Sequence, residues 1–429
     1  MDKDRNITPT TIIENDIMQL AALVGTGLLK NGAETYRVED SMLSILNSYS
    51  EYLSDPQVFA ITHYLTVSAQ DKDGNTIVVT QNAREVETNL NRVHLLNDFT
   101  RRVNRERPDI KTAIKEVKRI LATPRYSQSI YTIGVAMTGL AFTLLSGSTL
   151  VPALWAAVVS ALLTFIVKPL RRMGGNRIFV NIVRGVMIYV LMFPVMFTSY
   201  SNQIHLMTAG AFMYLFPGIM LVNSIRDLIA SDYLAGLIKM IETVLAATAL
   251  AVGSGIGAAF LTKVFNRPHS ELPTLTSINP DRPESILIAI LGVFSFLIIF
   301  DVKKLPLIIG SVGGGLGWLI YAQINRHKDF DYSLAIFIAI VFLATYSELM
   351  ARFTKKPVTV YLTAGLFPLV PGYDIYRTMN YFVTAQHDDF IDSFVRTLII
   401  TGTLALGIML VSSVAKLLYS YRSPHLNHH

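Results

Sequence analysis

Apolar residues are distributed in two different ways along the 429-residue chain. Up to about residue 125 they recur singly, at helical or alternating spacing, which is typical of a water-exposed domain. Beyond that point they form long continuous runs, and a run of about 20 apolar residues can cross a membrane as a helix. The pattern therefore predicts a polar head followed by a membrane body.

The head reads as helices around a small sheet. Helical spacing covers 15–29 and 35–52, and Lys30-Asn31-Gly32 between them is a helix-stop signal. Residues 58–70 form a run that predicts a strand, on which His63 alternates with apolar neighbours. An Asp-Gly step separates this strand from a second one at 76–80. A polar helical region follows over 85–121. We expect an N-terminal cytosolic α+β domain over residues 1–125.

The body contains ten candidate spans: 131–146, 149–167, 178–198, 205–229, 234–261, 286–300, 306–324, 332–351, 358–382 and 392–418. With a cytoplasmic head, the inward-facing loops carry twelve Lys and Arg residues. The outward-facing loops carry five, namely Lys263, Arg267, Arg282, Arg326 and Lys328. Because Lys and Arg favour the cytoplasmic side, this asymmetry predicts that both termini are cytoplasmic in a multi-pass plasma-membrane protein.

The body also resembles itself. Thr208-Ala209-Gly210 followed by Pro217-Gly218 recurs as Thr363-Ala364-Gly365 followed by Pro371-Gly372. The copies fall on the fourth span of two five-helix halves, and an odd number of spans per half gives the second half the opposite polarity. We therefore expect a 5+5 inverted repeat, as in many secondary transporters. Its parts are a first repeat at 126–265, an extracytoplasmic linker at 266–285, a second repeat at 286–420 and a tail at 421–429.

Composition agrees with a membrane protein and removes several kinds of chemistry. The chain is 51% hydrophobic and 16% charged, against about 25% charged in soluble domains, and its mean hydropathy is +0.42. It has no cysteine, which excludes disulfides, thiol nucleophiles and zinc-thiolate sites. No nucleotide-binding loop or secretory signal is recognisable, and we expect no cofactor and no metal. The net charge of +6 lies largely beside the spans and requires no nucleic-acid partner.

The repeated Pro-Gly pair predicts a substrate site. Proline removes a backbone hydrogen bond, so both fourth spans should break near the membrane midplane, where the N-terminal end of the following half-helix can receive an anionic group. A simple proline kink is the alternative. The candidate substrate-binding residues are Pro217, Gly218, Asn223, Pro371, Gly372, Tyr373 and Arg377.

Charged residues inside the spans are costly and suggest pairing or function. Glu242 and Asp374 lie well inside and are candidate proton carriers, with Asp227 as a third. Arg226, Asp227 and Glu348 lie nearer the cytoplasmic ends, where ordinary pairing or snorkelling explains them equally well. Gating or structural roles are assigned to Glu34, Arg37, Glu39, Arg184, Arg226 and Glu348. In contrast, the glycine-rich stretches 253–257 and 313–317 predict close helix packing.

Three blocks resemble a known family. Residues 27–42 read Gly-Leu-Leu-Lys-Asn-Gly-Ala-Glu-Thr-Tyr-Arg-Val-Glu-Asp-Ser-Met, and the blocks at 91–101 and 216–228 follow. They resemble the threonine/serine exporter (ThrE-like) family. The last 140 or so residues, including Val370-Pro371-Gly372-Tyr373, are similar to a small membrane subunit that some relatives encode separately, so the chain resembles the fused form. The resemblance carries over Gly32, Glu34, Thr35, Arg37 and Glu39 in the head and Pro217, Gly218, Asn223, Arg226 and Asp227 in the membrane.

The resemblance implies secondary export of threonine and serine across the bacterial inner membrane, driven by protons. Some split relatives are linked to dicarboxylate export, and Arg377 would suit a carboxylate-rich substrate, so an exporter of succinate-like dicarboxylates is the alternative. A membrane-anchored hydrolase and a channel are further alternatives, although no nucleophile-base pair is recognisable. The expected partners are an amino acid or a dicarboxylate, protons and the lipid bilayer. The sequence leaves homo-oligomerisation open.

Overall fold

A computed structural model describes residues 9–83, 87–265, 284–326 and 331–422. They form two compact units, Met1–Arg125 with Phe300–Val302, and Tyr126–Ile299 with Lys303–His429. Most of the predicted linker and tail, and with them Arg267, Arg282 and Lys328, lies outside the described residues.

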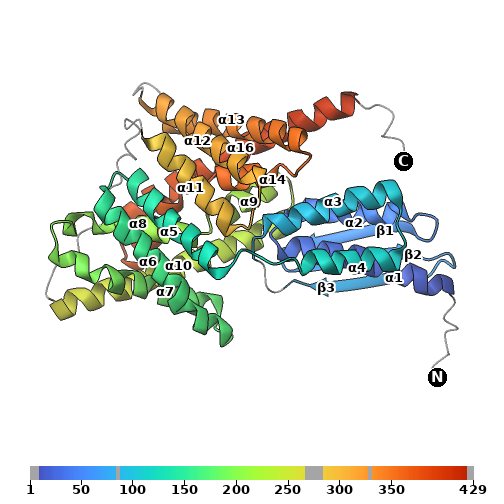
Figure 1. Ribbon diagram of the computed structural model, residues 1–429, viewed down its shortest axis with the longest axis horizontal. Helices are drawn as coiled ribbons and strands as arrows, with labels where there is room; N and C mark the ends of the chain where they lie inside the picture. The colour runs from blue at the N-terminus through green and yellow to red at the C-terminus, as the bar shows by residue number, and fades with distance from the viewer. Residues whose placement is uncertain (1–8, 84–86, 266–283, 327–330, 423–429) are drawn as a thin grey trace. The chain divides into compact units, whose positions relative to one another are not determined.

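Within its described residues, the first unit has four helices and one antiparallel sheet in the order β1-β2-β3 (Figure 1). Its elements are α1 (Pro9–Lys30), α2 (Thr35–Ser48), β1 (Ser54–Ile61), β2 (Tyr64–Gln70), β3 (Thr76–Asn82), α3 (Leu90–Glu106) and α4 (Ile110–Leu121). The Asp-Gly hairpin between β2 and β3 is confirmed: Asp71 Oδ1 accepts the backbone N–H groups of Asp73 and Asn75, and Gly74 has φ +80°.

Two predicted elements of this unit are divided. The strand expected over 58–70 is a hairpin, because the chain turns at Thr62 and His63 before β2 begins. The helical region expected over 85–121 is two helices, since α3 ends at Glu106, the following Arg107 has a left-handed backbone, and Asp109 caps the first turn of α4.

The core of the first unit forms around α1. Its residues Ile17, Leu20 and Val24 are fully buried, and they pack in one cluster with Leu65 and Val67 of β2. Each such aliphatic side chain stabilises the fold by roughly 1.5 to 3 kcal/mol. Helix α1 is long and apolar enough to cross a membrane, but these contacts make it a core helix of the first unit.

A short segment from far along the chain belongs to the same unit. Leu90 N–H donates to the carbonyl of Phe300 at 2.9 Å, and the Asn89 side-chain amide donates to Asp301 Oδ2 at 3.1 Å. Asn89 is fully buried, Asp301 is 3% exposed, and Asn89 also accepts from the N–H of Arg92 to cap α3. Phe300–Val302 is thus held by hydrogen bonds at the start of α3.

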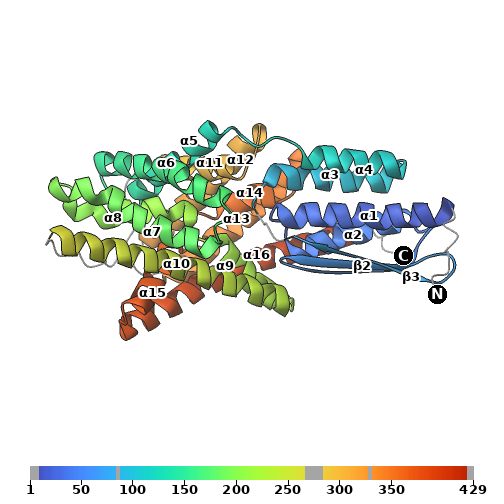
Figure 2. The same ribbon diagram turned by 90° about the horizontal axis from the view of Figure 1, so that it is seen from below.

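The second unit is helical throughout its described residues (Figure 2). Its first part comprises α5 (Gln128–Leu145), α6 (Leu150–Arg172), α7 (Arg177–Met192), the short η1 (Phe193–Phe197) and η2 (Ser201–Gln203), α8 (Ile204–Phe212), η3 (Met213–Leu215), α9 (Gly218–Ile229) and α10 (Tyr233–Phe265). Its second part comprises α11 (Ser285–Ile299), α12 (Leu305–Arg326), α13 (Tyr332–Thr354), α14 (Thr359–Gly365), α15 (Gly372–Val383) and α16 (His387–Arg422).

Many of these helices are suited to a membrane. Within the described residues, eight helices of the whole chain, α1 included, are long and apolar enough to cross one. The bent pair made of Ser201–Leu215 and Gly218–Ile229 would be a ninth, and α11 is apolar but only 15 residues long. These helices define a multi-pass membrane protein.

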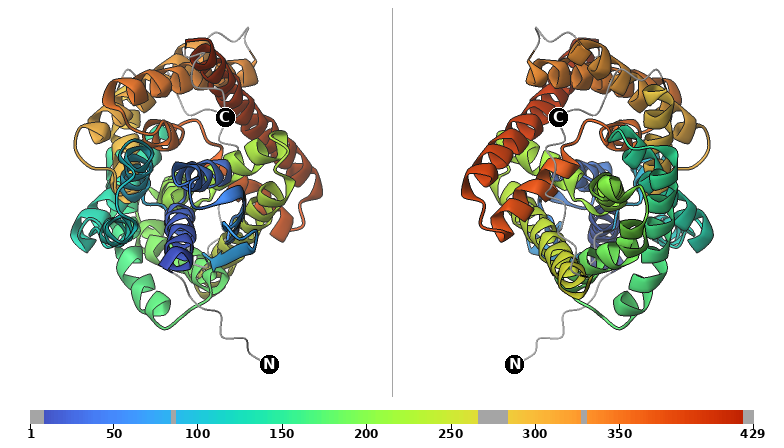
Figure 3. Two further views of the ribbon diagram at one scale, coloured as in Figure 1. Left: turned by 90° about the vertical axis from the view of Figure 1, so that its right-hand side faces the viewer. Right: turned by 90° about the vertical axis from the view of Figure 1, so that its left-hand side faces the viewer.

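The two parts of the second unit pack in corresponding ways. Helix α7 lies against α10 and α13 against α16, whereas α9 contacts both α10 and α16, and α15 contacts both α16 and α10. In Figure 3 the orange α13 and the dark red α16 can be seen next to each other. The two short helices are also alike: α9 and α15 are both 12 residues long. They end in the same way, since Ser231 and Ala385, two residues after each helix, both have positive φ.

The glycine-rich stretches serve helix packing, as predicted. A Cβ on Gly257 would lie 2.9 Å from Tyr189 Cβ on α7, and one on Gly314 would lie 2.6 Å from a methyl group of Val293 on α11. Only glycine allows these helices to approach so closely.

Candidate functional site

The first helix break lies at Phe216-Pro217. Proline has no N–H to continue the preceding helix, and Pro217 has φ −79° and ψ 42°, outside the helical range. Helix α9 begins at the next residue, Gly218, and it is bent by 56° from the preceding helix.

The second break has the same local form. Helix α14 ends at Gly365, the chain makes turns through residue 370, and Pro371 has φ −76° and ψ 52° before α15 begins at Gly372. The two Pro-Gly pairs thus produce matching breaks, each followed by a 12-residue helix.

These two breaks touch each other. A Cβ on Gly218 would collide with the Val370 side chain, and one on Gly372 would lie 3.0 Å from Met213 Sδ. Tyr376 on α15 stacks on Phe212 with ring centroids 4.8 Å apart and lies 5.8 Å from the ring of Phe216. The fold therefore brings two distant sequence motifs into one place.

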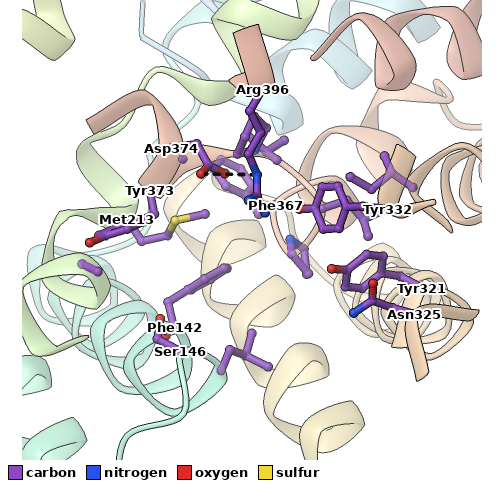
Figure 4. A pocket seen from close by; sticks show the side chains of 18 residues that line it. Phe142, Ser146, Met213, Tyr321, Asn325, Tyr332, Phe367, Tyr373, Asp374 and Arg396 are labelled. Carbon is purple, nitrogen blue, oxygen red and sulfur yellow. Dashed lines mark hydrogen bonds and ion pairs between the residues drawn. The ribbon is translucent and has the colours of Figure 1, made fainter. Parts of the chain in front are cut away.

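A cavity of about 340 Å³ opens beside the second break (Figure 4). Its lining comes from α5, α8, η3, α12, α13, the turns before α15, and the starts of α15 and α16. The residues are Phe142, Leu145, Ser146, Ala209, Met213, Tyr321, Asn325, Tyr332, Ile336, Phe367, Pro368, Leu369, Val370, Pro371, Gly372, Tyr373, Asp374 and Arg396. A mostly apolar cavity with a few polar groups is the usual form of a small-molecule site.

One carboxylate and one guanidinium face this cavity. Arg396 Nε lies 3.9 Å from Asp374 Oδ1, which is a long ion pair. The Asp374 side chain is 16% exposed and that of Arg396 46%. The Arg396 guanidinium also lies 4.9 Å from the centroid of the Tyr332 ring. The long distance leaves both charged groups able to bind a ligand.

Polar groups of other helices complete the lining. The Tyr373 hydroxyl is buried and has no hydrogen-bond partner among the described residues. Tyr321 meets Tyr332 edge to face at 5.8 Å, and Asn325 lies one turn further along α12. A buried hydroxyl without a partner costs free energy unless a ligand or water supplies one.

The structure brings only some of the predicted substrate residues to this cavity. Pro371, Gly372, Tyr373 and Asp374 line it. Pro217 and Gly218 form the neighbouring break but are outside the lining, and Asn223 is half-buried on α9, also outside it.

Arg377 is directed elsewhere. It is outside the lining, and its guanidinium lies 5.5 Å from the ring of Tyr381 on the same helix.

The other predicted charged residues lie outside the cavity. Asp227 is buried and forms a 2.5 Å ion pair with Lys239, which joins α9 to α10. Arg184 donates to Asn181 Oδ1 at 2.8 Å. Glu242, Arg226 and Glu348 are half-buried on α10, α9 and α13.

The charged trio of the head has partners within its own unit. Arg37 Nε lies 2.6 Å from Glu34 Oε2, and Glu39 Oε1 accepts the backbone N–H of Ala60 at 2.9 Å. Burial by itself lowers the pKa of Arg37, but Glu34 and Tyr36 outweigh burial and raise it above its ordinary value. Arg37 therefore remains charged, and Glu39 ties α2 to β1.

Sequence reasoning missed the partner of Asp374. Arg396 lies in the first turns of α16, inside a predicted apolar span, and that position was the available signal. Tyr321, Asn325 and Tyr332 lie at the facing ends of α12 and α13 and had no sequence signal. Among the described residues, no group of three or more His, Asp or Glu side chains could hold a metal ion.

Apolar, membrane-spanning helices that break beside a cavity with a few polar groups are typical of membrane transporters. Residues 19–261 match the family described as "Putative threonine/serine exporter", and residues 285–414 match "Threonine/Serine exporter, ThrE". The chain belongs to the threonine/serine exporter family, in its fused form, and this membership marks it as a transporter rather than an enzyme.

Two curated relatives cover most of the chain. It is 23% identical over 425 residues to the "Threonine/serine exporter" of Corynebacterium glutamicum, covering 96% of this chain and 84% of the relative. It is 21% identical over 380 residues to the "Probable threonine/serine exporter" of Mycobacterium tuberculosis, covering 87% of this chain and 71% of the relative. No solved structure matches.

Proposed function

We propose that the protein is a proton-coupled exporter of threonine and serine in the bacterial plasma membrane, with its substrate site in the cavity beside the second helix break. The family and its bacterial relatives support amino-acid export. The observation that carries the site is the pairing of one carboxylate, Asp374, with one guanidinium, Arg396, across the cavity.

This pair suits a zwitterion. Arg396 binds the α-carboxylate of the substrate and Asp374 binds its α-ammonium, so both charges of an amino acid are neutralised when it leaves water. Charge-assisted hydrogen bonds of this kind are about twice as strong as neutral ones. The Tyr373 hydroxyl, which has no partner among the described residues, is placed to bind the hydroxyl of threonine or serine.

The cavity suits a dicarboxylate less well. A succinate-like dianion needs two cationic groups, whereas Arg396 is the one cation among the described residues of the lining, and Asp374 would repel the second carboxylate. Arg377, the cation first assigned to such a substrate, lies outside the lining. The carboxylate-binding role passes in this proposal to Arg396.

Asp374 also serves as the proton carrier. Protonation removes its charge, so a proton and a substrate ammonium compete for the same carboxylate, which couples their movements in opposite directions. Glu242 and Asp227 remain candidates of lower rank, because Glu242 is outside the lining and Asp227 already has a close partner in Lys239.

The architecture that we propose is the 5+5 inverted repeat, with repeats at 126–265 and 286–420 joined by the linker at 266–285, a cytosolic α+β head at 1–125, and both termini in the cytoplasm. The matching Pro-Gly breaks and the corresponding packing of α9 and α15 support it. The contact between the breaks provides a point about which one repeat moves against the other.

Counterflow in proteoliposomes tests the proposal. Vesicles loaded with unlabelled threonine, serine or succinate are given the labelled compound, with and without a pH gradient, for the wild type, Asp374→Asn and Arg396→Gln. A matched control is Arg352→Gln, which removes an exposed arginine near the end of α13.

We expect gradient-dependent threonine and serine exchange in the wild type and the control. Arg396→Gln should lose at least tenfold in transport efficiency, and Asp374→Asn should lose its response to the gradient. Succinate exchange without threonine exchange would identify a dicarboxylate as the substrate. Unchanged threonine exchange in both cavity variants would refute the site.

A further inference from the structure

A second cavity, of about 290 Å³, lies among α5, α6, α7 and η3. It shares no lining residue with the first cavity. Its lining includes the cationic side chains of Lys168, Arg172 and Arg184, together with the hydroxyl-bearing Tyr131, Thr164 and Tyr214.

No carboxylate among the described residues pairs with the cations of this cavity. The lining contains no carboxylate, and Lys168, Arg172 and Arg184 form no ion pair among the described residues. Arg184 uses one Nη for Asn181, while its Nε is buried without a hydrogen-bond partner there. Three clustered cations without a counter-charge repel one another, so the site is suited to an anion.

The sequence explains why no neighbouring carboxylate compensates. Residues 126–226 contain six Lys and Arg residues and not a single Asp or Glu. The whole stretch from α5 to most of α9 therefore supplies only cations.

The surface of α6 indicates where the anion comes from. Val158, Leu162 and Phe165 are 48%, 42% and 53% exposed, and their spacing of four and three residues places them on one face of the helix. Lys168 and Arg172 follow Phe165 by one and two helical turns. An acyl chain lying on this apolar face would have its headgroup at the two cations.

We propose that this cavity binds the headgroup phosphate of an anionic phospholipid. Lys168 and Arg172 contact the phosphate, with Arg184 behind them, and the exposed stripe of α6 holds an acyl chain. Basic pockets between membrane helices bind anionic headgroups in this way, and arginine binds phosphate oxygens in a bidentate manner. This inference does not depend on the transported substrate.

Native mass spectrometry of the full-length protein tests the proposal. The wild type, Lys168→Gln/Arg172→Gln and the charge-retaining Lys168→Arg/Arg172→Lys are compared in detergent with added phosphatidylglycerol or phosphatidylcholine at equal concentration. The matched control is Arg352→Gln/Lys355→Gln, which removes two exposed cations from the end of α13.

The wild type, the control and the charge-retaining variant should keep phosphatidylglycerol in preference to phosphatidylcholine. The Gln variant should bind it roughly thirtyfold more weakly, because it loses two cations at the membrane surface, each contributing about 1 kcal/mol. Its melting temperature in lipid-free detergent, compared with that of the wild type, shows whether it is folded.

Three results would overturn the proposal. They are equal retention of the two lipids by the wild type, unchanged phosphatidylglycerol binding in the Gln variant, and displacement of phosphatidylglycerol by inorganic phosphate at equal concentration. The last would identify a free-anion site. If the Gln variant fails to fold, the single variant Lys168→Gln takes its place, with an expected loss of about fivefold.

Discussion

A long ion pair inside a cavity differs from a structural one. Asp374 and Arg396 are 3.9 Å apart, and Arg396 remains nearly half exposed, whereas Asp227 and Lys239 are 2.5 Å apart and largely buried. A close buried pair fixes two helices together. A loose pair can exchange its partner for a ligand, which is why the candidate chemistry is placed at Asp374.

The Tyr373 hydroxyl should recognise the substrate hydroxyl. Tyr373→Phe is expected to raise the KM for threonine by about threefold to tenfold, the value of one neutral hydrogen bond. The KM for 2-aminobutyrate, which lacks the hydroxyl, should not change. Proteoliposome uptake of both compounds measures the effect, and an equal change in both KM values would contradict a role in hydroxyl recognition.

The Asp227–Lys239 pair should be structural. Asp227→Asn removes the carboxylate that lies against the largely buried Lys239 ammonium and should destabilise the protein by about 3 kcal/mol. Asp227→Asn/Lys239→Met removes both charges and should recover most of this stability as well as gradient-driven transport. Thermal unfolding in detergent and counterflow check both effects. A stable double variant that no longer responds to the gradient would instead make Asp227 a proton carrier.

Sequence reasoning reached only one half of the loose pair. Asp374 was identifiable because a carboxylate is rare in an apolar segment. Arg396 lies 22 residues further on, in another helix, and no spacing rule connects two helices whose contact is set by tertiary packing. Asn325 and Tyr332 were not predicted for the same reason, because only tertiary packing brings α12 and α13 to the cavity.

At the scale of elements, the breaks were predictable and their contact was not. A proline lacks an N–H wherever it occurs, so Pro217 and Pro371 were bound to interrupt their helices. That the breaks meet depends on small residues at the crossing: Gly218 faces Val370, and Gly372 faces Met213. Similarly, no local signal divided β1 from β2, because the turn at Thr62 and His63 contains no Gly, Pro, Asn or Asp.

The crossing should tolerate no added volume. Gly218→Ala inserts a methyl group against Val370 and is expected to cost about 1 to 3 kcal/mol and to impair transport. Gly402→Ala is the matched control, since no atom lies within 4 Å of its added Cβ.

Gly218→Ala/Val370→Ala restores the space and should recover transport. Counterflow and thermal unfolding provide the measurements. A single variant that behaves like the control would show that the breaks are not tightly packed.

At the scale of the whole molecule, one compact unit contains two distant parts of the chain. The segment Phe300–Val302, between α11 and α12, is hydrogen-bonded to the start of α3. The start of α3 and Phe300–Val302 therefore belong to one packed group, and we expect a change at the start of α3 to affect both segments.

Asn89→Ala should loosen this connection. It removes the cap of α3, worth about 1 kcal/mol, and the hydrogen bond to buried Asp301. Hydrogen exchange followed by mass spectrometry should show faster exchange in the first turn of α3 and in residues 300–302 together. Asn82→Ala, at the exposed end of β3, is the control. Faster exchange in α3 alone would show that the segment is held by other contacts.

The reciprocal packing of the short helices affects how the membrane unit could be divided. Helix α9 lies against α16 as well as α10, and α15 lies against α10 as well as α16. Each part therefore supplies one short helix that packs against the long helix of the other part. The arrangement resembles a domain-swapped dimer whose two copies are joined in one polypeptide. A fragment ending at residue 265 would leave α9 without α16 and α10 without α15, so we expect the two parts to fold stably only together.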